Sequence, residues 1–120
     1  MIRWLIVGCA LVLASPQPAA EKPETEWIKL LSKELGGEAE HRTPDGSRVD
    51  ILTDKVAWEV EWARKWQEAI GQAHFYALAT NRRPGIVLLL TGDKSEKVYY
   101  LRCLAVCAKT GITLRTHRIK

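Results

Sequence analysis

Apolar and polar residues alternate over residues 49–62, and this two-residue period predicts two β-strands joined by a tight turn. One face of the pair is apolar and consists of Val49, Ile51, Trp58, Val60 and Trp62. If residues 54–55 form a two-residue loop, Asp50 lies opposite Glu59 on the other face. Glu61 shares that face, because side chains alternate along a strand. The sequence therefore predicts three carboxylates side by side.

Like charges this close destabilise a fold unless a positive charge neutralises them. Mg²⁺ is suited to the task, because it takes one or two carboxylates and keeps several waters. Two simpler interpretations stay open. Glu61 could form a surface ion pair with Arg48, which lies opposite in the same register, and Asp50 and Glu59 could lie on a solvated face. A loop of odd length would separate Asp50 from Glu59 and remove the site.

A helix is predicted after Trp62 and up to about Thr80, where a run of Asn, Arg and Pro ends it. Its expected buried stripe is Trp66, Ala69, Ile70, Ala73 and Ala77. A polar stripe beside it contains Lys65, Glu68, Gln72 and Tyr76. Gln72 and Tyr76 are one turn apart and point the same way. They could serve a site beside the helix or form the polar rim of a core helix.

An Asp on one strand, E-x-E on the next and a helix with Q-x-x-x-Y resemble the PD-(D/E)XK nuclease superfamily. The helix motif is similar to that of its RecB and phage-exonuclease branch. The matching residues are Asp50, Glu59, Glu61, Gln72 and Tyr76. The resemblance spans residues 25–117 as an order of elements. It implies a restriction-endonuclease-like fold and hydrolysis of the DNA backbone with Mg²⁺ or Mn²⁺. Glu61 departs from the family pattern, since Lys is usual there, and Pro44-Asp45 lies in a turn rather than at the site.

The resemblance implies a role for each matching residue. Asp50 and Glu59 would hold the metal, Glu61 would position water or a second metal, and Gln72 and Tyr76 would orient the site or contact the nucleic-acid backbone.

Further residues extend this expected site. Glu34 on the first helix is expected to be a metal ligand, as first-helix Glu residues are in this superfamily, or else a helix-end residue in solvent. Lys65 is expected to supply the positive charge that Glu61 lacks, unless it is a solvated Lys paired with Glu61 or Glu68. The expected phosphate contacts are Arg64, Arg82 and Arg83.

The remaining pattern completes an α/β chain of order α-β-β-β-α-β-α-β, in which helices flank a mixed sheet. Outside the segments already described, the expected elements are a helix at 24–35, strands at 38–43, 86–91 and 112–117, and a helix at 95–109. Two cysteines, Cys103 and Cys107, fall four apart on that last helix. Their spacing suits a disulfide poorly, so they are interpreted as buried apolar residues.

The first 20 residues of the 120 combine Arg3, an apolar run and small residues, which is typical of a signal peptide. The expected organisation is a leader at 1–20, a linker at 21–24 and a single domain at 25–120. The protein would then be exported, periplasmic or secreted. If the first 20 residues are only a loose apolar tail, the protein would be cytoplasmic. The apolar run is too short for a stable membrane span.

The net charge of +4 permits an anionic partner but does not by itself select nucleic acid. DNA is the partner that the resemblance implies, and no small-molecule cofactor is expected. The sequence leaves the oligomeric state open. A binding or assembly protein on the same fold that has lost catalysis is the second hypothesis, because Lys is missing at the position of Glu61. A third is a small envelope protein whose carboxylates only make a polar face.

Overall fold

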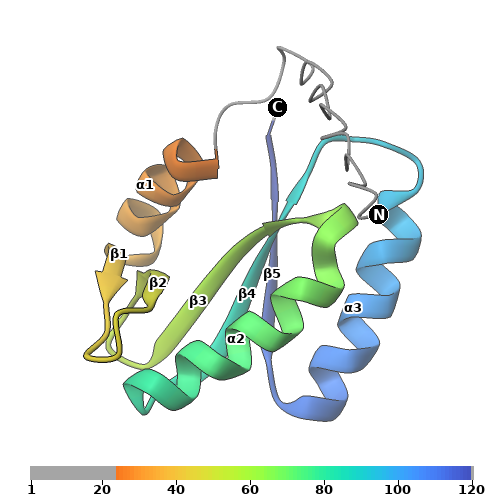
Figure 1. The fold of residues 1–120 in the computed structure, drawn as a ribbon. Coiled ribbons are helices and arrows are strands. Elements are labelled where there is room, and N and C mark those ends of the chain that lie inside the picture. The colour runs from red at the N-terminus through yellow and green to blue at the C-terminus, as the bar shows by residue number, and fades with distance from the viewer. Residues whose placement is uncertain (1–23, 120) are drawn as a thin grey trace, which may run out of the picture.

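The computed structural model describes residues 24–119, which form one five-stranded sheet between helices (Figure 1). The elements are α1 (Glu24–Leu35), β1 (Glu38–Arg42), β2 (Arg48–Leu52), β3 (Val56–Trp62), the short 3-10 helix η1 (Ala63–Lys65), α2 (Trp66–Thr80), β4 (Arg83–Leu90), α3 (Glu96–Thr110) and β5 (Thr113–Arg118). The predicted order of helices and strands is confirmed, with η1 added before α2. The predicted leader at 1–20 and most of the linker lie outside the described residues.

The strands lie side by side in chain order, β1 to β5. The first two pairings are antiparallel and the last two are parallel. Parallel neighbours need a crossover, and α2 and α3 provide the two crossovers. The strand expected at 86–91 begins earlier, at Arg83, because that residue pairs with Val56. The carboxyl ends of β3, β4 and β5 therefore meet at one edge of the sheet.

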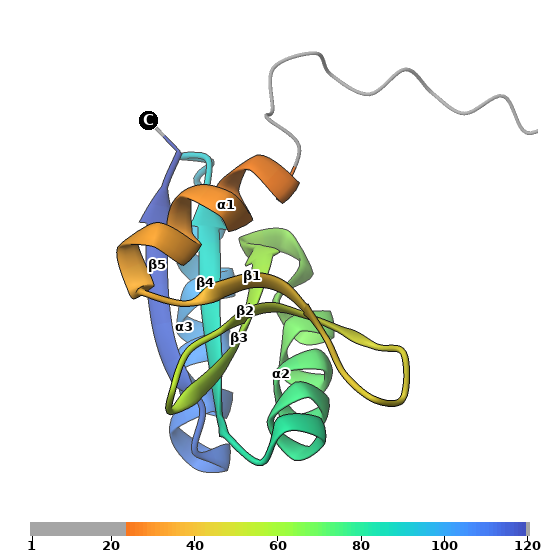
Figure 2. The ribbon, with the colours of Figure 1, turned by 90° about the vertical axis from the view of Figure 1, so that its left-hand side faces the viewer.

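The helices cover the two faces of the sheet unequally. In Figure 2, α1 crosses in front of the sheet, α3 lies behind it and α2 lies to its right. The core under α1 contains Trp27, Ile28, Leu31, Ile51, Trp58, Val60, Trp62, Val87 and Leu89. The core under α2 and α3 contains Ala69, Ala73, Ile86, Leu88, Cys103, Cys107 and Ile112. Successive residues of β4 alternate between the two cores, as expected for a strand buried on both faces.

The helix α3 carries the two cysteines into the second core. Both are buried and free, with their Sγ atoms 3.8 Å apart. The interpretation of Cys103 and Cys107 as buried apolar residues is confirmed. None of the described helices has the length and apolarity needed to cross a membrane.

The glycine at position 85 is required by the packing of Trp58. The indole lies across β4, and a Cβ at Gly85 would come within 2.6 Å of Trp58 Cε3 and of Val56 Cγ1. Arg115 covers the same indole, with its guanidinium carbon 5.6 Å from the ring centroid. Trp58 is therefore packed between the β4 backbone at Gly85 and the Arg115 guanidinium.

We expect Gly85→Ala to lower the free energy of unfolding by about 1–3 kcal/mol, because the added methyl group overpacks the sheet against Trp58. Gly71→Ala is the matched control. Gly71 lies in α2, and nothing lies within 4 Å of the place that a methyl group would take there. Alanine at position 71 should therefore stabilise the helix by about 0.5–1 kcal/mol. Urea unfolding measures both. Equal stability of the two variants would contradict this packing.

Candidate active site

The β2–β3 hairpin has the two-residue loop that the sequence predicted. Thr53 N–H donates to Val56 O over 2.9 Å, and this bond closes the loop at residues 54–55. The ladder keeps the predicted register. Continued by one residue, this register sets Asp50 beside Glu59 on the face covered by α2. Directly opposite side chains have Cβ atoms roughly 4.5–5.5 Å apart.

The three strand carboxylates differ in their hydrogen bonds. Asp50 Oδ2 accepts from Val60 N–H over 2.9 Å. Glu61 Oε1 accepts from the N–H of Trp62, also over 2.9 Å. Glu59 is only 5% exposed, and its Oε2 atom is buried with no hydrogen-bond partner among the described residues. Buried oxygens are normally paired, so this atom is available for a ligand.

Burial and mutual repulsion make Glu59 the group that holds a proton. Burial, followed by the negative charge of Asp50, raises the pKa of Glu59 to about 10. Burial also raises the pKa of Asp50, but the Val60 N–H stabilises the Asp50 carboxylate and opposes that rise. At neutral pH Glu59 therefore keeps its proton.

A fourth acid, Glu24, joins the group from the first residue of α1. Its Oε1 atom is buried and has no hydrogen-bond partner among residues 24–119. Burial, followed by the charge of Glu61, raises the pKa of Glu24 to about 7, while the charge of Lys65 opposes this. Glu24, Asp50, Glu59 and Glu61 are called the acidic cluster below.

The structure brings Glu24, and not Glu34, to this cluster. Glu34 is exposed near the other end of α1. Ten residues separate the two, which is about 15 Å along a helix. Sequence reasoning missed Glu24, because an acid in the first turn of a helix is expected for its favourable interaction with the helix dipole. The first-helix acid beside Glu61 is therefore Glu24, at the start of α1, and not the expected Glu34.

The helix α2 brings Tyr76 to the same cluster. Tyr76 is half-buried, and its burial together with the negative charges of Glu59 and Asp50 raises the pKa of its hydroxyl. The tyrosine therefore stays a hydrogen-bond donor at neutral pH. Gln72 is exposed one turn earlier on α2.

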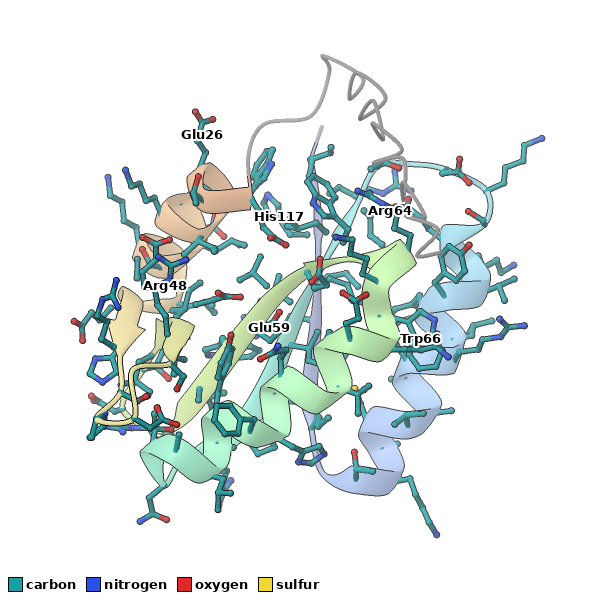
Figure 3. All side chains as sticks on the ribbon, in the orientation of Figure 1. Glu26, Arg48, Glu59, Arg64, Trp66 and His117 are labelled. Atoms are coloured by element: carbon teal, nitrogen blue, oxygen red, sulfur yellow. The ribbon has the colours of Figure 1, made fainter. Side chains whose placement is uncertain are left out.

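Two cationic side chains lie beside the acidic cluster, each next to a different acid of the cluster. The charge of Lys65 acts on Glu24, while the charge of Arg48 acts on Asp50 and Tyr76 and opposes the rise in the pKa of both. Figure 3 shows Arg48 on the β2 side of Glu59. The sequence predicted Lys65 as the cation of the site, and the structure adds Arg48 beside the central pair.

The three arginines predicted to contact phosphate do not form one patch. Arg64 stacks on Trp62, with 5.4 Å between its guanidinium carbon and the ring centroid, and lies towards α3 in Figure 3. Arg82 donates to Asp54 O and to Thr80 O, each over 3.1 Å. Arg82 and Arg83 line a pocket of about 560 Å³ at the start of β4. The length of β3, roughly 20 Å, separates them from Arg64.

The donor set fits a hard divalent cation. Within residues 24–119, no three His, Cys, Asp or Glu side chains already form a metal-ligand set. Mg²⁺ does not need one, because one or two carboxylates and several waters complete its coordination. Asp50 and Glu59 provide such a pair, with a buried carboxylate oxygen that lacks a partner.

Comparison with known proteins gives a match to a viral protein. Over 69 residues the chain is 35% identical to protein L33 of Acanthamoeba polyphaga mimivirus, which is named for a KilA-N domain. The match covers 58% of this chain and 27% of L33, so the chain spans about a quarter of that relative. No protein-family model matches the chain. No solved structure matches it either.

With metal chelated by EDTA, we expect the free energy of unfolding to fall as the pH rises from about 5.5 to 8.5. An unfolded Glu loses its proton near pH 4.5, whereas folded Glu59 keeps it until about pH 10. Between these values the folded state binds more protons, so stability falls by up to about 1.4 kcal/mol per pH unit. Urea unfolding at several pH values measures this slope.

Glu59→Gln should reduce the slope, because the variant has no proton to lose at this position. Glu34→Gln should leave the slope unchanged, since Glu34 is exposed. An equal slope in wild type and Glu59→Gln would show that Glu59 ionises normally in the folded protein.

Proposed function

We propose that this protein is a metal-dependent phosphodiesterase that hydrolyses the DNA backbone, with the restriction-endonuclease-like fold of the PD-(D/E)XK superfamily. The observation that carries the proposal is the pair of Asp50 and buried Glu59, in which Glu59 Oε2 has no partner among the described residues. Two carboxyl groups this close repel each other when both are ionised, and a bound cation would offset that repulsion.

The fold supports the proposal through the order of its elements. The acids come from two neighbouring strands, and Tyr76 comes from the helix that follows, as the resemblance implies. The match to the mimivirus protein is consistent with nucleic-acid binding. Hydrolysis and the superfamily assignment rest on the acidic cluster and on the sequence resemblance.

Asp50 and Glu59 would hold Mg²⁺ or Mn²⁺. When bound, the metal polarises the scissile phosphate and lowers the pKa of a bound water. The N–H of Val60 fixes the orientation of the Asp50 carboxylate. Glu61, whose Oε1 is fixed by the Trp62 N–H, can hold the attacking water with its other oxygen. Tyr76, as a protonated donor, can bind a phosphate oxygen, and Gln72 can contact the backbone one turn away.

A nucleic-acid-binding protein without catalysis is the second candidate. Glu61 favours it, because an acid at this position cannot supply the positive charge of the usual Lys. In that case the acidic cluster would bind a cation that bridges protein and phosphate.

The first experiment is cleavage of plasmid and single-stranded DNA with Mg²⁺ or Mn²⁺ beside an EDTA control. We expect metal-dependent cleavage by wild type and none by Asp50→Asn or Glu59→Gln. Both variants should remain folded, because each relieves repulsion within the pair. Asp54→Asn, in the exposed hairpin loop, is the matched control and should cleave normally. DNA binding without cleavage would favour the second candidate, and unfolding of both variants would make the acids structural.

The second experiment compares the two acids at the ends of α1 by calorimetric titration with Mn²⁺. Glu24→Gln should weaken Mn²⁺ binding by about 10-fold or more, as loss of a supporting carboxylate does in other metal sites. Glu34→Gln should bind as wild type does. The reverse result would restore Glu34 as the first-helix ligand and would contradict the placement of Glu24.

A further inference from the structure

We propose that Arg48 is the cation that contacts the scissile phosphate and takes the place of the Lys missing from the E-x-E triplet. This inference rests on the proposed phosphodiesterase function. It assigns the positive charge of the site to the strand that carries Asp50 rather than to the start of α2.

The backbone places Arg48 on the same face as the acid pair. Arg48 is the first residue of β2 and precedes Asp50 by two residues. Residues two apart on a strand share a face, about 7 Å apart, so the Arg48 side chain starts from the face that carries Asp50 and Glu59. Figure 3 shows Arg48 on the β2 side of Glu59.

The charge of Arg48 reaches both sides of the pair. The Arg48 guanidinium stabilises the ionised form of Asp50 on its own strand and of Tyr76 on α2. These residues flank Glu59 from the strand side and from the helix side. A phosphate bound to a metal at Asp50 and Glu59 would lie on the sheet face from which the Arg48 side chain starts.

The ion pair of Arg48 holds its side chain only weakly. Its Nη1 atom lies 4.0 Å from Glu40 Oε1, and the two side chains are 53% and 32% exposed. Ion pairs of this kind contribute little to stability, so the guanidinium can exchange Glu40 for a phosphate. A planar fork of N–H donors binds phosphate in a bidentate manner, which makes Arg well suited to this contact.

Lys65 starts from a different place, the end of η1, beyond the carboxyl end of β3. Its charge acts on Glu24 at the start of α1. This arrangement suits a cation that supports the outer part of the acidic cluster. Lys65 is therefore expected to matter less for the chemical step than Arg48.

The test is single-turnover cleavage of DNA at saturating enzyme with Mg²⁺, using Arg48→Ala, Arg48→Lys, Lys65→Ala and Arg42→Ala. Arg42 is the matched control, because it is an exposed arginine that pairs with Arg48 across the β1–β2 ladder. Arg48→Ala should slow cleavage by about 10²–10³-fold, the usual effect of losing one electrostatic donor. Arg48→Lys should recover part of that loss, and Arg42→Ala should stay within about 3-fold of wild type. Lys65→Ala should slow cleavage less than Arg48→Ala does.

Thermal unfolding of each variant separates a catalytic role from a structural one. If Arg48 is catalytic, Arg48→Ala should melt at a temperature close to that of wild type although it cleaves DNA slowly. If Arg48→Ala does not fold, Arg48→Met replaces it, since it keeps much of the apolar stem without the charge.

The outcomes separate this inference from the proposed function. Normal cleavage by a folded Arg48→Ala, beside an inactive Asp50→Asn, would overturn the role of Arg48 and leave the phosphodiesterase in place. A slow Lys65→Ala with a normal Arg48→Ala would move the role to Lys65. A wild-type protein that cleaves no DNA would overturn the proposed function and this inference together.

Discussion

The register between β2 and β3 is the constraint on which the candidate site depends. The hydrogen bond between Thr53 N–H and Val56 O closes a two-residue loop and sets Asp50 beside Glu59. A loop one residue longer or shorter would turn one of the two acids to the opposite face. The apolar partners of these strands, Ile51 and Trp58, would move with them and lose their place under α1. The same packing that stabilises the fold therefore also fixes the two acids.

The fold can tolerate this acidic pair because the two cores around it are extensive. Residues 86–89 of β4 are buried and contribute side chains to both cores. Trp58 packs between Gly85 and Arg115. The β3 strand next to β4 therefore has a rigid support. Within that support, Glu59 keeps a buried oxygen without a partner among the described residues. Energetically costly local arrangements of this kind persist where the surrounding structure holds them, and they are concentrated at functional sites.

Periodicity predicted most of the fold. The helices at 24–35 and up to Thr80, the hairpin register and the buried stripe of Ala69, Ala73 and Ala77 all follow from local pattern, and the structure confirms them. Strand and helix ends were less accurate. The β4 strand starts at Arg83 because pairing with β3 extends it beyond its apolar run.

The members of the candidate site that come from distant segments could not be predicted in this way. Glu24 reaches the acidic cluster only because α1 crosses the sheet with its first turn near the end of β3. This placement depends on tertiary packing and not on local sequence. Its sequence position indicates no more than a favourable helix start. For Arg48 and Lys65, the side-chain lengths allow several directions, so spacing alone did not show which acids each cation approaches. Arg82 illustrates the same limit, since its Nε donates to the Asp54 carbonyl in the β2–β3 loop and its Nη1 to the Thr80 carbonyl at the end of α2.

A protonated pair of Asp50 and Glu59, converted by a divalent cation into a phosphodiesterase site, is the hypothesis that joins these features. Titration of the metal-free protein with Mn²⁺, by calorimetry near pH 7 in buffers of different ionisation enthalpy, tests it most directly. A carboxyl group must lose its proton to bind metal, so binding should release roughly one proton per site, and Glu59→Gln should abolish both the binding and the release. Absence of Mn²⁺ binding, or binding that releases no proton and persists in Glu59→Gln, would contradict the hypothesis.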